Sequence, residues 1–265
     1  KRTLCIASCL VSMGSQADLS DWDIHASNTL RVENISIDGD ANASPYAIDG
    51  DQAYDEFNIS IARQLSPYSY IRGQFAGVVN DSAYRHPDDG FVPERASLEI
   101  QNGNFGVPFK VNAGDYYANL SNRTLQRSLK GAQVELQPFS SVSSQHSLLL
   151  FSGADQPFWN SLDYDENRYT GASWLAAGSW GEATVNAINN SFKSPSMNEM
   201  DDMDESFSQW VYSVSYGNEL ELGSQLLDIS AEFSAFDGDL DATRLDQSGN
   251  GYFAEIIGRS TTLTA

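Results

Sequence analysis

The chain has 265 residues, a formal net charge of -21, 41% hydrophobic residues and a mean hydropathy of -0.37. This composition is too polar for helical membrane spans, and the sequence contains no run of about 18 apolar residues. Aromatic residues make up 11% of the chain, which is too many for a disordered polypeptide. The excess of Asp and Glu, 36 against 15 Lys and Arg, argues against nucleic acid and against anionic phospholipid as partners.

Residues 1–17 have the features of a secretory signal peptide. A basic start at Lys1 and Arg2 precedes a short apolar stretch, and Ser15-Gln16-Ala17 resembles a small-x-small cleavage site. The alternative is a buried N-terminal strand or helix. Both cysteines of the chain lie in this segment, so a mature chain would have no thiol nucleophile and no Cys-ligated metal. We therefore expect an exported protein with a polar leader at residues 18–28 and a β domain at residues 29–265.

The segment from Phe57 to Val79 alternates apolar and polar residues with a period of two, which predicts strands with one apolar and one polar face. Ser66-Pro67 interrupts the alternation, as expected for the turn of a hairpin. The same pattern predicts further strands within residues 29–35, 94–103, 107–120, 129–139, 146–153, 169–192, 207–216, 226–236 and from 251 onward. Two strands are expected in 169–192, with a turn near Gly181, and another tight turn at Tyr216-Gly217-Asn218.

Two kinds of connection separate these strands. Tight turns alternate with long acidic loops at residues 80–93, 153–168, 193–206 and 237–251. Strands of about 9–11 residues with this alternation of connections are typical of outer-membrane barrels. We therefore predict an all-β fold, an antiparallel up-and-down transmembrane β-barrel, with a soluble β-sandwich as the alternative. Because the sequence stops within the strand begun at Tyr252, we expect the barrel to be incomplete within these residues and to continue past them.

We expect the apolar face of the strands to contact lipid and the polar face to line a hydrated lumen. The predicted lipid-facing residues are Phe57, Ile59, Ile61, Leu227, Ile229 and Phe233. The predicted lumen-facing residues are Asn58, Ser60, Gln64, Asp228, Ser230 and Glu232. The aromatic residues expected at the membrane interfaces are Tyr68, Tyr70, Trp210 and Tyr212.

The segment AGDYYANLSNRTLQRSLKGAQVEL, residues 113–136, resembles the strand–turn–strand pattern of bacterial outer-membrane barrels of the porin and usher type. There a Gly-Asp closes one strand, a polar loop follows, and a basic residue with Gly opens the next strand. The matching positions are Gly114-Asp115 and Lys130-Gly131, and the match covers a small part of the chain. The resemblance implies the outer membrane of a Gram-negative bacterium, with membrane lipid and the outer-membrane assembly machinery as partners. The plug and periplasmic domains of ushers have no counterpart, so pilus export is not implied.

Sites for catalysis are poorly supported by the sequence. The histidines, His25, His86 and His146, have no metal-ligand spacing. A hydrolase at the rim of a barrel would need His86 to act with Asp88 or Asp89, whereas a polar loop histidine is the simpler interpretation. No G-x-S-x-G, phosphate loop or H-E-x-x-H occurs. We expect no enzyme.

One acidic stretch has the spacing of a calcium loop. Asp237, Asp239 and Asp241 match its first positions, but the Gly at the sixth position is missing, and Ser248 stands where a bidentate Glu is needed. A similar start lies at residues 38–42. The turn preference of Asp-Gly explains both stretches. Calcium is therefore the one ion for which the sequence offers a candidate site. We otherwise expect the protein to need no cofactor.

These observations predict a non-enzymatic outer-membrane β-barrel. It would act as a pore, or as the membrane anchor or translocation part of a secretion or adhesin system. The alternative is a soluble, secreted, β-rich binding module with acidic loops that bind calcium or surface polymers.

Overall fold

A computed structural model describes residues 21–36, 50–82, 85–121, 124–141, 143–157, 159, 162–164, 167–194, 205–222, 225–240 and 247–260. All the regular structure in these ranges is β-strand. None of the described residues forms a helix long and apolar enough to cross a bilayer. The strands are β1 (Asp23–Ile35), β2 (Gly50–Ser66), β3 (Ser69–Asp81), β4 (Gly90–Asn102), β5 (Phe109–Ser121), β6 (Leu125–Ser140), β7 (Ser144–Ala154), β8 (Asn167–Gly178), β9 (Gly181–Ser194), β10 (Glu205–Leu222), β11 (Gln225–Leu240) and β12 (Gln247–Ser260).

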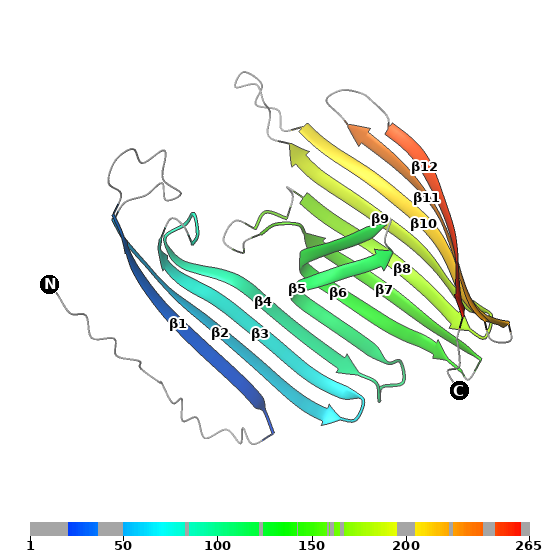
Figure 1. Cartoon of the computed structure of the whole chain (residues 1–265), viewed down its shortest axis with the longest axis horizontal. Coiled ribbons are helices and arrows are strands. Elements are labelled where there is room, and N and C mark those ends of the chain that lie inside the picture. Colours follow the sequence, from blue (N-terminus) through cyan, green and yellow to red (C-terminus); the bar gives the residue numbers. More distant parts are fainter. Residues whose placement is uncertain are drawn as a thin grey trace.

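The twelve strands form one antiparallel sheet in which each strand pairs with the next along the chain, in the order β1 to β12. Figure 1 shows this sheet curving strongly around one concave side. The predicted all-β, up-and-down arrangement is therefore confirmed. The strands form one continuous sheet, whereas a β-sandwich would consist of two sheets packed face to face.

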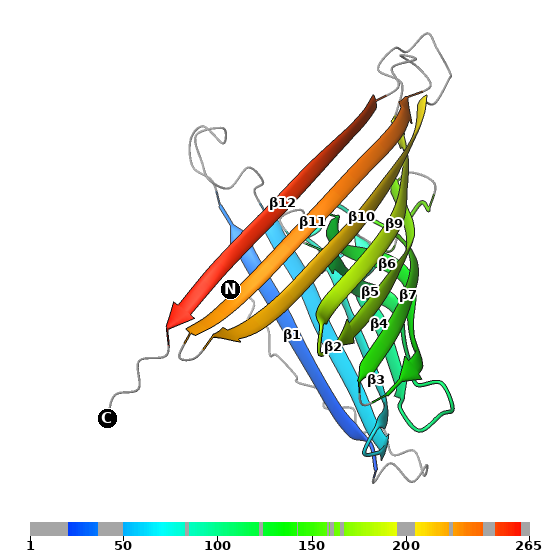
Figure 2. The same ribbon diagram turned by 90° about the vertical axis from the view of Figure 1, so that its right-hand side faces the viewer.

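The sheet is not closed. Within the described residues, β1 pairs only with β2, and β12 pairs only with β11. Each of these two strands therefore has an outer edge whose backbone N–H and C=O groups have no ladder partner. The described sheet is a curved wall rather than a complete cylinder, and Figure 2 shows it turned by 90° with β12, in red, along one edge.

The connections differ at the two ends of the sheet. Tight turns join β2 to β3 at residues 67–68 and β8 to β9 at residues 179–180. Long connections join β1 to β2, β7 to β8 and β9 to β10, at residues 36–49, 155–166 and 195–204. Because successive strands are antiparallel, the long connections lie at one end and the tight turns at the other. The predicted alternation of turn lengths is present with two exceptions: the short segment 122–124 joins β5 to β6 at the end of the long connections, and the six residues 103–108 join β4 to β5 at the end of the tight turns.

Cross-strand register divides the sheet into two faces, because partners directly opposite one another point to the same side. The face that we call the apolar face carries Ile59, Phe75, Leu98, Val111, Val134, Leu150, Trp174, Val185, Val214, Phe233 and Tyr252. The opposite, polar face carries Ser60, Gln74, Ser97, Asn112, Gln133, Ser173, Asn186, Ser213 and Ser234. This division follows directly from the period-two alternation in the sequence.

The first strand begins earlier than predicted. Residues 23–28, predicted to belong to a polar leader, are the start of β1, and Asp23 pairs with Ala62. Their alternation of Ile24 and Ala26 with polar residues already has a strand period. Residues 1–20 lie outside the described residues, so the signal peptide remains a prediction.

The tight turn predicted at Tyr216-Gly217-Asn218 is wrong. β10 runs through these residues to Leu222, and Gly217 pairs with Ser230 on one side and with Glu182 on the other. Turn-forming residues are tolerated there because a strand on each side fixes the backbone, so tertiary pairing overrides local preference.

Candidate functional site

A hairpin lies across the concave side of the sheet and is the feature that most affects how much of that side is open. β4 pairs with β5 only as far as Gly114, and β7 pairs with β6 only as far as Lys130. Beyond this point β5 and β6 stay paired with each other. Figure 1 shows their ends leaving the wall and lying across the concave side. We call residues 115–121 and 124–130 the inward hairpin.

Paired glycines mark the bend. Gly114 faces Gly131 across the hairpin and has a φ of 93°. A Cβ atom on Gly114 would lie 2.0 Å from the carbonyl oxygen of Ala96, and one on Gly131 would lie 2.1 Å from that of Ser152. Only glycine permits so close an approach to the neighbouring strands, and Gly114 also needs the freedom of glycine to adopt a positive φ. The two glycines therefore allow the hairpin to depart from the wall.

Gly114→Ala should displace the inward hairpin. The added methyl group meets backbone rather than a flexible side chain, and we expect a cost of roughly 1–3 kcal/mol or more. Limited proteolysis of the folded chain should then cleave the hairpin faster than in the unchanged protein. Gly106→Ala is the matched control, since a Cβ atom there meets nothing within 4 Å. Equal cleavage rates for the two variants would contradict the role assigned to Gly114.

An ion pair lies immediately next to the glycines. Asp115 pairs with Lys130 across the hairpin, and Lys130 is only 4% exposed. The second carboxylate oxygen of Asp115 accepts hydrogen bonds from the backbone N–H of Ala96 (2.7 Å) and from the indole N–H of Trp159 (2.8 Å). The Lys130 ammonium lies 4.9 Å from the centre of the Trp159 ring. Both charges are thus compensated where the hairpin leaves the wall, as a buried pair requires.

The tip of the hairpin reaches the opposite part of the wall. The Ser121 and Thr124 hydroxyls donate hydrogen bonds of 2.6 and 3.0 Å to one carboxylate oxygen of Glu232 in β11. Thr124 also lies 2.8 Å from the hydroxyl of Ser213 in β10, which accepts a hydrogen bond from the Asn186 amide. Polar-face residues of strands that are not neighbours therefore meet, which identifies the polar face as the concave one.

Apolar side chains fill the space between the inward hairpin and the wall. The buried cluster consists of Tyr116, Ala118, Leu125, Leu129, Phe151, Tyr169 and Ile188, with Leu120 and Val211 packed against it. The hairpin is thus held by a small core in its middle and by hydrogen bonds at its tip. Part of the concave side is filled with protein rather than open.

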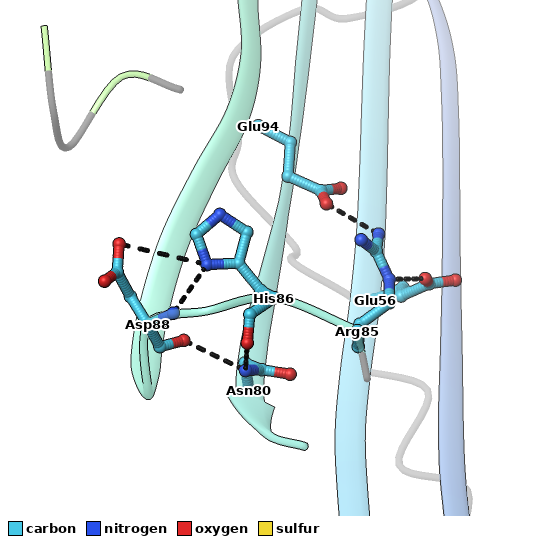
Figure 3. A network of polar contacts seen from close by, with 6 residues as sticks. All are labelled: Glu56, Asn80, Arg85, His86, Asp88 and Glu94. Carbon is cyan, nitrogen blue, oxygen red and sulfur yellow. Dashed lines mark hydrogen bonds and ion pairs between the residues drawn. The ribbon is translucent and has the colours of Figure 1, made fainter. Parts of the chain in front are cut away.

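A second inward element is the β3–β4 connection, shown in Figure 3. Arg85 bridges Glu56 of β2 and Glu94 of β4, with distances of 2.6 Å to each carboxylate. Burial alone would lower the pKa of Arg85, but hydrogen bonds and charges from the two glutamates outweigh it and raise that pKa above its usual value. The Asn80 amide donates to the backbone carbonyls of His86 and Asp88. These contacts fix the connection over the polar face.

The predicted lipid-facing and lumen-facing residues fall on two opposite faces. Cross-strand register places Phe57, Ile59, Ile61, Leu227, Ile229 and Phe233 on the apolar face. It places Asn58, Ser60, Gln64, Asp228, Ser230 and Glu232 on the polar face. Ile59 and Phe233 are 42% and 51% exposed, whereas Glu232 is 8% exposed.

The predicted interfacial aromatics do not share one environment. Trp210 and Tyr212 lie on the apolar face of β10 with stacked rings, and Tyr68 is exposed in the β2–β3 turn. Tyr70, in contrast, lies on the polar face, and its hydroxyl donates a 2.6 Å hydrogen bond to Glu99. The even-numbered residues of β3 point to that side, so Tyr70 shares the polar face with Gln74.

The predicted calcium positions are mostly in a strand. Asp237 lies in β11 opposite Ser248, and Asp239 is also within β11, while Asp241 lies outside the described residues. An extended strand does not wrap around an ion as a calcium loop does. Among the described residues, no group of three or more acidic, His or Cys side chains is arranged to hold a metal ion. Calcium binding stays a prediction.

The histidines show no catalytic arrangement among the described residues. The Nδ1 atom of His86 accepts a hydrogen bond from the backbone N–H of Asp88 and lies 3.9 Å from the Asp88 carboxylate, as Figure 3 shows, so its contacts are within its own loop. His146 Nε2 lies 2.9 Å from the Ser144 hydroxyl. However, His146 Nδ1 has no hydrogen-bond partner in the described part of the chain, so the third group of a triad is missing there.

Sequence reasoning missed the inward hairpin. Its signal was present in the Gly-Asp and Lys-Gly pairs, which carry the resemblance to outer-membrane barrels and which the structure brings face to face.

No protein-family model and no curated protein sequence matches the chain.

Proposed function

We propose that the chain forms the wall of a non-enzymatic outer-membrane β-barrel that acts as a pore or as the membrane part of a secretion or adhesin system. The observation that carries this proposal is the apolar face, which continues across the whole sheet. Its exposed side chains come from the first strand to the last and include Leu30, Ile59, Leu98, Leu150, Trp174, Val214 and Tyr252.

An apolar surface of this extent needs a partner. Exposed apolar patches on soluble monomers rarely exceed a few hundred Å². A hydrocarbon environment would cover this face without a second protein layer, and wherever a strand is paired on both sides its backbone groups need no partner from the solvent. Lipid is therefore the cover that the proposal assigns to the apolar face.

The concave side supports a hydrated lumen that is partly obstructed. It carries Ser, Asn, Gln and charged side chains, and the inward hairpin lies across it. The long connections gather at one end of the sheet, as in outer-membrane barrels, whose longer loops lie on the cell-surface side. We assign this end to the cell surface and the tight turns to the periplasm.

Fractionation of cells that express the chain tests the proposal. The protein should appear in the outer-membrane fraction, remain there after a urea wash, and require detergent for extraction. The control lacks residues 1–17 and should stay in the cytoplasm. Recovery of the exported chain as soluble protein would favour a secreted β-rich binding module instead.

A further inference from the structure

We propose that the concave side contains a binding subsite for a small monocarboxylate that also carries hydroxyl groups, such as a sugar acid. The subsite is a pocket of about 320 Å³ on the polar face of β3 to β6, next to the base of the inward hairpin. The inference deepens the proposed function, since it assigns a solute class to the lumen.

One carboxylate on the pocket wall, that of Glu99, has a partner at each of its two oxygens. Glu99 accepts a hydrogen bond from the Tyr70 hydroxyl at one oxygen (2.6 Å) and pairs with the Lys110 ammonium at the other (2.9 Å). Glu99 and Lys110 therefore cancel each other's charge, as do Asp115 and Lys130 at the base of the hairpin.

Arg72 is the remaining cation of the pocket, because it belongs to neither of these two ion pairs. Its guanidinium lies 5.5 Å from the centre of the Tyr70 ring and forms no hydrogen bond or ion pair with any described residue. Arg72 is exposed toward the pocket that it lines. A cation–π contact with the ring does not use the N–H groups of the guanidinium, and their planar fork fits a carboxylate with two parallel hydrogen bonds.

Neutral polar groups surround this cation. Gln74 faces Ser97 across β3 and β4, and Asn112 faces Gln133 across β5 and β6. All four line the pocket, and none of their side chains makes a hydrogen bond with another residue of the described part. Amides and hydroxyls both donate and accept, so they match the hydroxyl groups of a polyol.

The charges favour a monoanion. Arg72, Lys110 and Lys130 together carry one more charge than Glu99 and Asp115, and one carboxylate balances that excess, whereas a dianionic phosphate would place excess negative charge beside the two acidic side chains. The rest of the chain, with a net charge of -21, would oppose that excess further. A carboxylate with neutral hydroxyls fits both the charge and the polar lining.

Saturation-transfer NMR on outer-membrane vesicles carrying the full chain tests the subsite, with glucuronate as the probe. Glucuronate should give a saturable signal, and glucose should bind at least about tenfold more weakly, because it lacks the carboxylate. Arg72→Gln should weaken glucuronate binding by about tenfold or more, and Arg72→Lys should restore part of it, since the charge returns without the fork. The matched control is Arg95→Gln, which removes another polar-face arginine outside the pocket lining.

Equal binding of glucuronate by Arg72→Gln and the unchanged chain would overturn the subsite. No glucuronate signal from a chain that is protease-resistant in the membrane would overturn it as well, and would leave the membrane proposal intact. If fractionation instead recovers a soluble chain, the membrane proposal fails, and the same titration on the soluble protein still decides the subsite.

Discussion

Ile59→Arg should prevent most of the chain from assembling in the outer membrane. Ile59 lies on the apolar face of β2 with 42% of its surface exposed, where the proposal places lipid. An arginine facing lipid near the bilayer midplane costs about 2–4 kcal/mol, falling toward zero at the interfaces. Phe233→Arg, on the same face of β11, should act in the same way. The measurement is the amount of each variant that resists urea extraction from the outer-membrane fraction.

Ser60→Arg is the matched control, because it places the same side chain one residue later on the polar face. This variant should assemble like the unchanged chain, since its guanidinium can remain hydrated. Equal loss of assembly for Ile59→Arg and Ser60→Arg would mean that both faces are buried to the same degree, and the barrel proposal would fail.

The second large effect that we expect comes from the open edges of β1 and β12, and it concerns the stability of the chain as a monomer. In a bilayer, each backbone group without a hydrogen-bond partner costs several kcal/mol. We therefore expect the chain to stay in the outer membrane only where another chain covers these edges, so that extraction of the chain expressed alone into detergent gives no heat-modifiable, protease-resistant monomer. Electrophoresis of boiled and unboiled samples, with limited proteolysis, provides the measurement.

A compact monomer that migrates faster before boiling would show that β1 and β12 can pair with one another. In that case the sheet closes within these strands and the expectation is wrong. A defined oligomer would show instead that the edges of neighbouring copies meet.

Strand identity and sidedness were readable from the sequence because both depend on residues two apart. In β11, Leu227, Ile229 and Phe233 alternate with Asp228, Ser230 and Glu232, and the register keeps the two sets on separate faces. Burial of one face strongly specifies such a pattern, since a slip by one residue would exchange the faces. This is why nearly every predicted strand was found close to its expected place.

What the sequence did not reveal depends on contacts between distant residues. Gly217 has the local character of a turn, but pairing with β9 and β11 keeps it in a strand. Glu232 was predicted to face the lumen, yet nothing near it in sequence indicates Ser121 or Thr124 as its partners. Arg72 was not singled out at all, because its importance comes from the pairing of Glu99 with Lys110 on other strands.

The inward hairpin also has a consequence for the order of folding. Every strand pairing in the sheet joins consecutive strands, so the wall can grow by local steps with small loop-closure costs. The hydrogen bond between Ser121 and Glu232 joins residues 111 positions apart, and it needs β10 and β11 already in place. Docking of the hairpin tip should therefore be a late event. The apolar cluster that contains Leu125 and packs against Leu120 also packs against Val211 of β10, so a chain stalled before β10 is the form most exposed to proteolysis and aggregation.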